Sequence, residues 1–108
     1  FPLAPIKVAV FPLNAKDKLP DKAKEIYNQL KIQFSSQYDE KDSIGKRYRR
    51  QDAIGTPFCI TVDYESLETN KVTIRNRDSM QQERISADKI NKYLENNTSL
   101  NILLNQLD

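Results

Sequence analysis

The sequence predicts a mixed α/β domain, and three observations support this prediction. Two short runs, at positions 6–11 and 58–63, are almost entirely apolar and rich in β-branched residues, as in strands covered on both faces. Segments with the apolar spacing of a helix alternate with them. The chain has 108 residues, 38% hydrophobic and 30% charged, which suffices for one domain with its own core. This order of elements indicates helices on both sides of the sheet.

Three helical segments follow from local signals. The first is expected to begin at residues 19–21, where a proline suits the first turn and an acid favours the helix dipole. A second is expected over 44–54 and a third over 87–94, each preceded by a serine that can cap it. A last amphipathic segment is expected over 100–107. The apolar stripe of the first helix is expected to contain Ala23, Ile26, Tyr27, Leu30 and Phe34.

The remaining segments complete the sheet. A short polar strand is expected over 37–41, and a turn over 66–70. Residues 71–77 alternate between apolar and polar side chains, which predicts a half-buried strand. Because the gap from the strand at 58–63 is short, the two strands are expected to be antiparallel. A final edge strand is expected at 83–85.

The composition excludes several kinds of chemistry. The chain has no His, one Cys and two Gly. Histidine-dependent catalysis, a cysteine-rich zinc site and a glycine-rich phosphate loop therefore cannot be built from it, and no metal site is expected. Cys59 is expected to be a buried core thiol. An enzyme acting on a small phosphorylated metabolite is a weak hypothesis, since no general base in a tuned environment is evident.

A group of basic residues marks the helix at 44–54. The net charge is only +2, but four cations fall within five positions, and helical spacing gathers them on one face. Such a face suits the binding of an anionic partner. The alternative is a solvated helix face on which Asp52 pairs with Arg49. The four cations are Lys46, Arg47, Arg49 and Arg50.

The polar face of the strand at 71–77 adds acids to arginines. Carboxylates accept hydrogen bonds from base amino groups and guanidinium groups donate to base acceptors, so this mixture suits reading of exposed bases in single-stranded RNA. An exposed face closed by salt bridges is the alternative. The polar residues are Asp63, Glu65, Thr73, Arg75 and Arg77, and the aromatic residues that could stack on bases are Phe58 and Tyr64.

Three stretches carry a family resemblance. Residues 3–13 and 45–58 resemble the C-terminal anticodon-binding domain of the homodimeric, class II glycyl-tRNA synthetases, and residues 72–85 strengthen the match. The Tyr-Arg-Arg-Gln-Asp run at 48–52 and the Arg-Asp-Ser-Met run at 77–80 are similar to the glycyl branch in particular. The resemblance covers about residues 3–93.

The resemblance implies a three-layer α/β/α fold with a five-stranded mixed sheet, in the order 2-1-3-4-5 with strand 4 antiparallel. It also implies one anticodon-binding domain over 1–108, with 94–108 as a C-terminal helical extension. A separate catalytic domain, absent here, would attach glycine to tRNA with ATP and Mg²⁺, so this fragment would not be an enzyme and needs no cofactor. The parent is expected to be cytoplasmic and homodimeric through regions outside the fragment.

The leading hypothesis is recognition of glycine tRNA, with no DNA or membrane partner. Glycine anticodons carry cytosines at their second and third positions. Asp63 or Glu65 would accept from a cytosine and Arg75 would donate, with Thr73 or Phe58 supporting. The alternative is the same fold acting as a protein-interaction or dimerisation module without RNA reading. The phosphate contacts would be Lys46, Arg47, Arg50 and Arg77.

Overall fold

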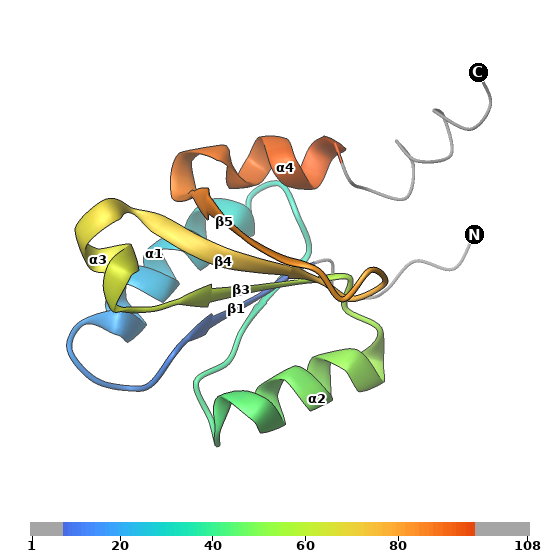
Figure 1. The fold of residues 1–108 in the computed structure, drawn as a ribbon, viewed down its shortest axis with the longest axis horizontal. Helices are drawn as coiled ribbons and strands as arrows, with labels where there is room; N and C mark the ends of the chain where they lie inside the picture. Colours follow the sequence, from blue (N-terminus) through green and yellow to red (C-terminus); the bar gives the residue numbers. More distant parts are fainter. Residues whose placement is uncertain (1–7, 97–108) are drawn as a thin grey trace.

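The computed structural model describes residues 8–96, which form one five-stranded sheet between layers of helices (Figure 1). The strands are β1 (Val8–Pro12), β2 (Ser36–Tyr38), β3 (Phe58–Val62), β4 (Lys71–Asn76) and β5 (Gln82–Ser86). The helices are α1 (Leu19–Leu30), α2 (Ile44–Ile54), α3 (Tyr64–Thr69) and α4 (Ile90–Asn96), and the 3-10 turn η1 (Ala87–Lys89) precedes α4. The strand order is β2-β1-β3-β4-β5. β1 is parallel to β2 and β3, whereas β4 is antiparallel to β3 and β5.

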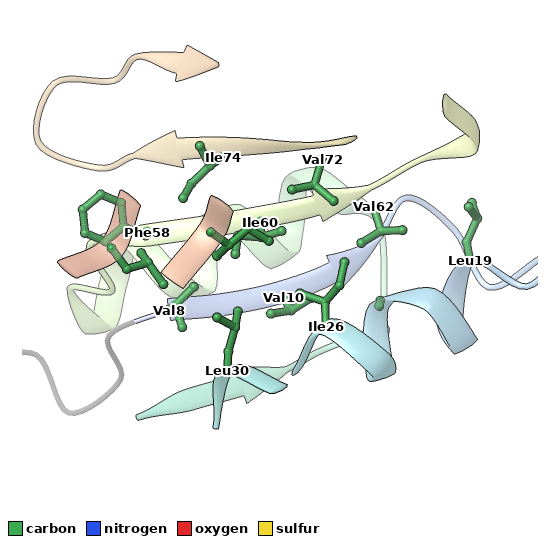
Figure 2. Packing of buried hydrophobic residues seen from close by; sticks show 13 residues of the cluster. Val8, Val10, Leu19, Ile26, Leu30, Phe58, Ile60, Val62, Val72 and Ile74 are labelled. Carbon is green, nitrogen blue, oxygen red and sulfur yellow. The ribbon is translucent and has the colours of Figure 1, made fainter. Parts of the chain in front are cut away.

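The main core lies on the side of the sheet that α1 and α4 cover (Figure 1). Alternate residues of β1 and β3 point to this side, as the two-residue period of a strand requires. Figure 2 shows them packed against α1. The labelled members of this cluster are Val8, Val10, Leu19, Ile26, Leu30, Phe58, Ile60, Val62, Val72 and Ile74.

A smaller cluster lies under α2, on the opposite side of the sheet. Ala9, Phe11 and Cys59 are buried there, with Ile44 and Tyr48 of α2 packed on them. The Tyr48 ring meets Phe11 edge to face, with 5.3 Å between ring centroids. Helices therefore cover both faces, and the predicted three-layer fold, strand order and antiparallel fourth strand are confirmed, together with the buried Cys59 thiol.

Local signals account for the helix ends. Pro20 lies in the first turn of α1, and Ala23, Ile26 and Leu30 of the predicted stripe are buried. Phe34 is only partly buried and follows the end of the helix instead of extending its stripe. The Ser43 hydroxyl accepts a hydrogen bond from Lys46 N–H at the start of α2. The helix ends at Gly55, whose φ of 81° lies in the left-handed region that favours glycine.

Two predicted segments differ in the structure. The predicted turn at 66–70 is mostly helix α3, because Asp63 and Ser66 form a capping box that starts a helix directly after β3. The second strand covers 36–38 and not 37–41, since the Asp39 side chain accepts from Lys41 N–H and Arg50 and the chain turns there. Residues 97–108, which include the predicted segment at 100–107 and most of the extension at 94–108, lie outside the described residues.

Candidate nucleic-acid interface

Part of the sheet on the α2 side is polar and is not covered by that helix. In β4, Val72 and Ile74 are buried in the main core, so Thr73 and Arg75 point to the other side. Thr73 lies opposite Arg84 of β5, and Arg75 lies opposite Gln82. Directly opposed residues share a face. We call the group Thr73, Arg75, Gln82 and Arg84 the open sheet face.

Arg75 is the inner member of this face. Its Nη1 lies 3.2 Å from Asp52 Oδ1, and its guanidinium carbon lies 5.1 Å from the centre of the Tyr48 ring. Only 11% of its side chain is exposed. Arg75 therefore connects β4 to α2, and it reaches the surface only along one border of the face. Asp52 pairs with Arg75 across the layers, and no ion pair with Arg49 is present among residues 8–96.

Arg84 is the outer member, and its guanidinium is held by two acids. Its Nη2 donates to Asp63 Oδ2 at 2.6 Å and its Nη1 to Asp63 Oδ1 at 3.3 Å, while its Nε lies 3.3 Å from Glu65 Oε2. Asp63 Oδ1 also accepts from Ser66 as the cap of α3. The hydrogen bond from Arg84 lowers the pKa of Asp63, and the same bond raises the pKa of Arg84. Both Asp63 oxygens are engaged, whereas half of the Glu65 side chain is exposed.

The four cations of α2 do not share one face. Arg47 is only 2% exposed, and it donates through Nη1 to Pro12 O at 2.5 Å and through Nη2 to Leu13 O at 3.3 Å. Burial lowers the pKa of its guanidinium. The predicted four-cation face is therefore wrong for Arg47, because backbone carbonyls at the end of β1 hold this side chain inside. The Arg47 side chain is therefore not accessible to RNA in this structure.

The other three cations are exposed on α2. Arg50 points toward β2, where it pairs with Asp39 at 2.7 Å and Asp42 at 2.8 Å. Lys46 and Arg49 are exposed and form no ion pair with any residue of 8–96. Arg49 lies one turn before Asp52, which contacts Arg75, so Arg49 is on the flank of α2 that borders the open sheet face.

Phe58 and Arg77 lie away from the centre of the open sheet face. Phe58 is 5% exposed and points into the main core (Figure 2). Its ring meets that of Tyr93 edge to face. The suggestion that Phe58 stacks on a base is therefore wrong in this structure, since its neighbour Cys59 is the one that lies opposite Arg75. Tyr64 is 44% exposed. Arg77 is 42% exposed beside the β4–β5 turn, where its Nε donates to Asp52 O.

Sequence reasoning missed Arg84 and Gln82, and it identified Arg49 as a cation of α2 without including it among the phosphate contacts. The signal for the first two was the hairpin register: extending the edge strand from 83–85 to 82–86 places Arg84 beside Thr73 and Gln82 beside Arg75. Within residues 8–96, no group of three His, Cys, Asp or Glu side chains could hold a metal ion. No helix in that range is long and apolar enough to cross a membrane.

Comparison with known proteins identifies the family. The sequence profile described as "Anticodon binding domain" matches residues 7–97. The chain belongs to the anticodon-binding-domain family. This domain also has the fold of the RNA binding domain of threonyl-tRNA synthetase from Cryptosporidium parvum, with a TM-score of 0.76 and 21% identity over 84% of this chain and 23% of that one.

The similar relatives of this anticodon-binding domain are glycine–tRNA ligases, in agreement with the resemblance to the glycyl branch. The ligase of Caldanaerobacter subterraneus is 58% identical over 93 residues, which cover 86% of this chain and 20% of the relative. The ligase of Treponema denticola is 61% identical over 83 residues, or 77% of this chain and 18% of the relative. The chain thus spans about a fifth of the length of the relatives it matches.

Proposed function

We propose that this domain recognises the anticodon loop of glycine tRNA as the C-terminal module of a glycine–tRNA ligase. The identity to glycine–tRNA ligases supports the choice of tRNA. The observation that carries the proposal is the open sheet face, a polar surface bordered by Arg49 of α2, which has no ion-pair partner among residues 8–96.

In this proposal the two kinds of contact have different locations. Glu65, Thr73 and Arg75 lie at or beside the open sheet face and contact base edges, with Asp63 acting through Arg84. Lys46, Arg49 and Arg77 contact phosphates and orient the loop. Arg47 and Arg50 are left out, because the first is buried and the second is paired on the opposite flank of α2.

The rest of the ligase performs the chemistry in this proposal. Glycine activation with ATP and Mg²⁺, transfer to tRNA and homodimer formation belong to parts of the protein outside this chain. The location is the cytoplasm, and neither DNA nor a membrane is a partner. The residues of this chain supply recognition only.

The proposal is tested by titrating the 108-residue chain with a hairpin RNA that carries the anticodon loop of a glycine tRNA. A second hairpin has both anticodon cytosines replaced by uracil, and each titration is repeated at low and moderate salt. Binding that prefers cytosine and weakens with salt is expected, because phosphate contacts release counterions. Absence of binding at both salt concentrations overturns the proposal and favours the protein-interaction module.

A pair of double variants separates the cation contacts from general charge. Lys46→Ala with Arg49→Ala removes two exposed cations of α2, of which Arg49 borders the open sheet face. Lys89→Ala with Lys92→Ala removes two exposed cations of η1 and α4, on the other side of the sheet. The first pair is expected to reduce the slope of log affinity against log salt by about 0.7 for each phosphate that the variant no longer neutralises, for both hairpins alike. Equal effects of the two pairs would remove α2 from the interface.

A further inference from the structure

The hydrogen bonds of Arg84 leave a donor at the surface. A guanidinium has five N–H groups. In Arg84, Nη1 donates to Asp63 Oδ1 and Lys71 O, Nη2 donates once to Asp63 Oδ2, and Nε faces Glu65. One Nη2 N–H thus has no acceptor among residues 8–96. About 30% of the Arg84 side chain is exposed, against 11% for Arg75.

Glu65 leaves an acceptor beside that donor. Its Oε2 lies 3.3 Å from Arg84 Nε, and its Oε1 has no partner among the described residues. Half of the Glu65 side chain is exposed. Asp63 cannot serve in the same way, because it accepts from Ser66 and from both Nη atoms of Arg84. Its bonds to two Arg84 nitrogens restrict the guanidinium in orientation, as expected for a bidentate pair.

We infer that Arg84 and Glu65 together read the base edge of a cytosine, with Asp63 positioning Arg84. This inference rests on the proposed function. The spare N–H of Arg84 donates to cytosine N3 while Glu65 accepts from the N4 amino group. Arg84 is thereby the specificity-determining arginine, and Arg75, which also fixes α2 to the sheet, is a secondary base contact.

The donor–acceptor pair discriminates by pattern. Uracil presents a carbonyl where cytosine has its amino group and an N–H where cytosine has an acceptor, so both contacts become repulsive. Guanine presents the same reversed pattern. Adenine shares the amino-plus-acceptor pattern, and its larger ring has to be excluded by shape. A bidentate pair of this kind is expected to favour cytosine over uracil by about 5- to 150-fold.

The test uses the ratio of affinities for the cytosine and uracil hairpins described above. Arg84→Lys keeps the charge but loses the planar fork that binds both Asp63 oxygens and directs a further N–H outward. We expect the ratio to fall to about threefold or less, with the salt slope unchanged. Arg50→Lys is the matched control, because Arg50 is also held by two acids, on the opposite flank of α2. It should keep the ratio of the unmodified chain.

Glu65→Gln provides the second variant, since the Glu65 carboxylate contacts only Arg84 among the described residues. A glutamine amide can present either its carbonyl or its N–H, so affinity for the uracil hairpin should rise and the ratio should fall. Glu68→Gln, an exposed neighbour on α3, is its control. Unchanged ratios in both Arg84→Lys and Glu65→Gln would overturn the inference while the cytosine preference of the unmodified chain still supports the proposed function. Failure of the unmodified chain to bind would instead overturn the proposed function itself.

Discussion

Replacing Arg47 by alanine is expected to destabilise the domain without acting on RNA binding directly. The guanidinium is buried under α2, and its hydrogen bonds end on the carbonyls of Pro12, Leu13 and Asp39. It also lies 5.7 Å from the centre of the Phe11 ring. Its loss therefore removes one polar connection from α2 to the end of β1 and to the loop that follows β2.

The magnitude follows from these contacts. A hydrogen bond from a charged donor contributes about 1.5–3 kcal/mol, and the bond to Pro12 O at 2.5 Å is the one with the shortest distance. The bonds to Leu13 O at 3.3 Å and Asp39 O at 3.4 Å are long and add less. Relief of the buried charge offsets part of the loss. We therefore expect a decrease of about 2–4 kcal/mol in the free energy of unfolding, which lowers Tm by about 10–25 °C.

Urea denaturation followed by circular dichroism measures this change, with Lys46→Ala as the exposed control. The control should change the free energy of unfolding by less than about 0.5 kcal/mol. A loss below about 1 kcal/mol for Arg47→Ala would refute the structural role assigned to this arginine. So would a variant of normal stability that binds all RNA hairpins weakly, because Arg47 would then be a phosphate contact.

Three further predictions concern single positions. Gly55→Ala should lower the free energy of unfolding by about 1 kcal/mol in the same assay, because its φ of 81° is unfavourable for a residue with a Cβ. The pKa of Asp63 is lowered by Arg84, so this carboxylate stabilises the folded chain above its unfolded pKa of about 3.9 and the contribution is lost as pH falls through the folded value. Asp63→Asn should therefore flatten the decrease of stability below about pH 4, measured by urea denaturation at several pH values. Burial raises the pKa of Cys59 to about 12, so a thiol reagent at neutral pH should label it only after denaturation, and rapid labelling of the folded chain would contradict its buried position.

Much of the fold followed from periodicity. The two apolar strands and the alternation of Val72 and Ile74 fixed which segments are buried, and the bounds of α2 matched because Ser43 and Gly55 are strong end signals. The helix α3 was missed because Asp63 and Ser66 also suit a turn. In the structure the reciprocal bonds of the capping box between these two residues select the helix.

The candidate site was less predictable because it depends on pairs of elements. Arg47 lies about 60° from Ile44 around the helix, at the border of the apolar face. Its burial is decided by the carbonyls of β1, which no pattern within α2 reveals. Phe58 was assigned to the wrong face of the sheet because alternation within one strand does not state which of its residues shares a face with Arg75 of the next strand. The cross-strand register, with Cys59 opposite Arg75, supplies that information.

The two helical layers are attached to the sheet by different forces. On the α1 and α4 side a large apolar cluster provides the attachment, whereas under α2 the buried hydrophobic residues among positions 8–96 are Ala9, Phe11 and Cys59. Polar contacts such as Gln51 with Gln37, and Asp52 with Arg75, hold the rest of that helix. Regions with few buried apolar contacts open locally at a lower free energy than the whole domain. We therefore expect the amides of α2 to exchange with solvent before those of α1, and the layer that carries Lys46 and Arg49 can loosen while the main core stays folded.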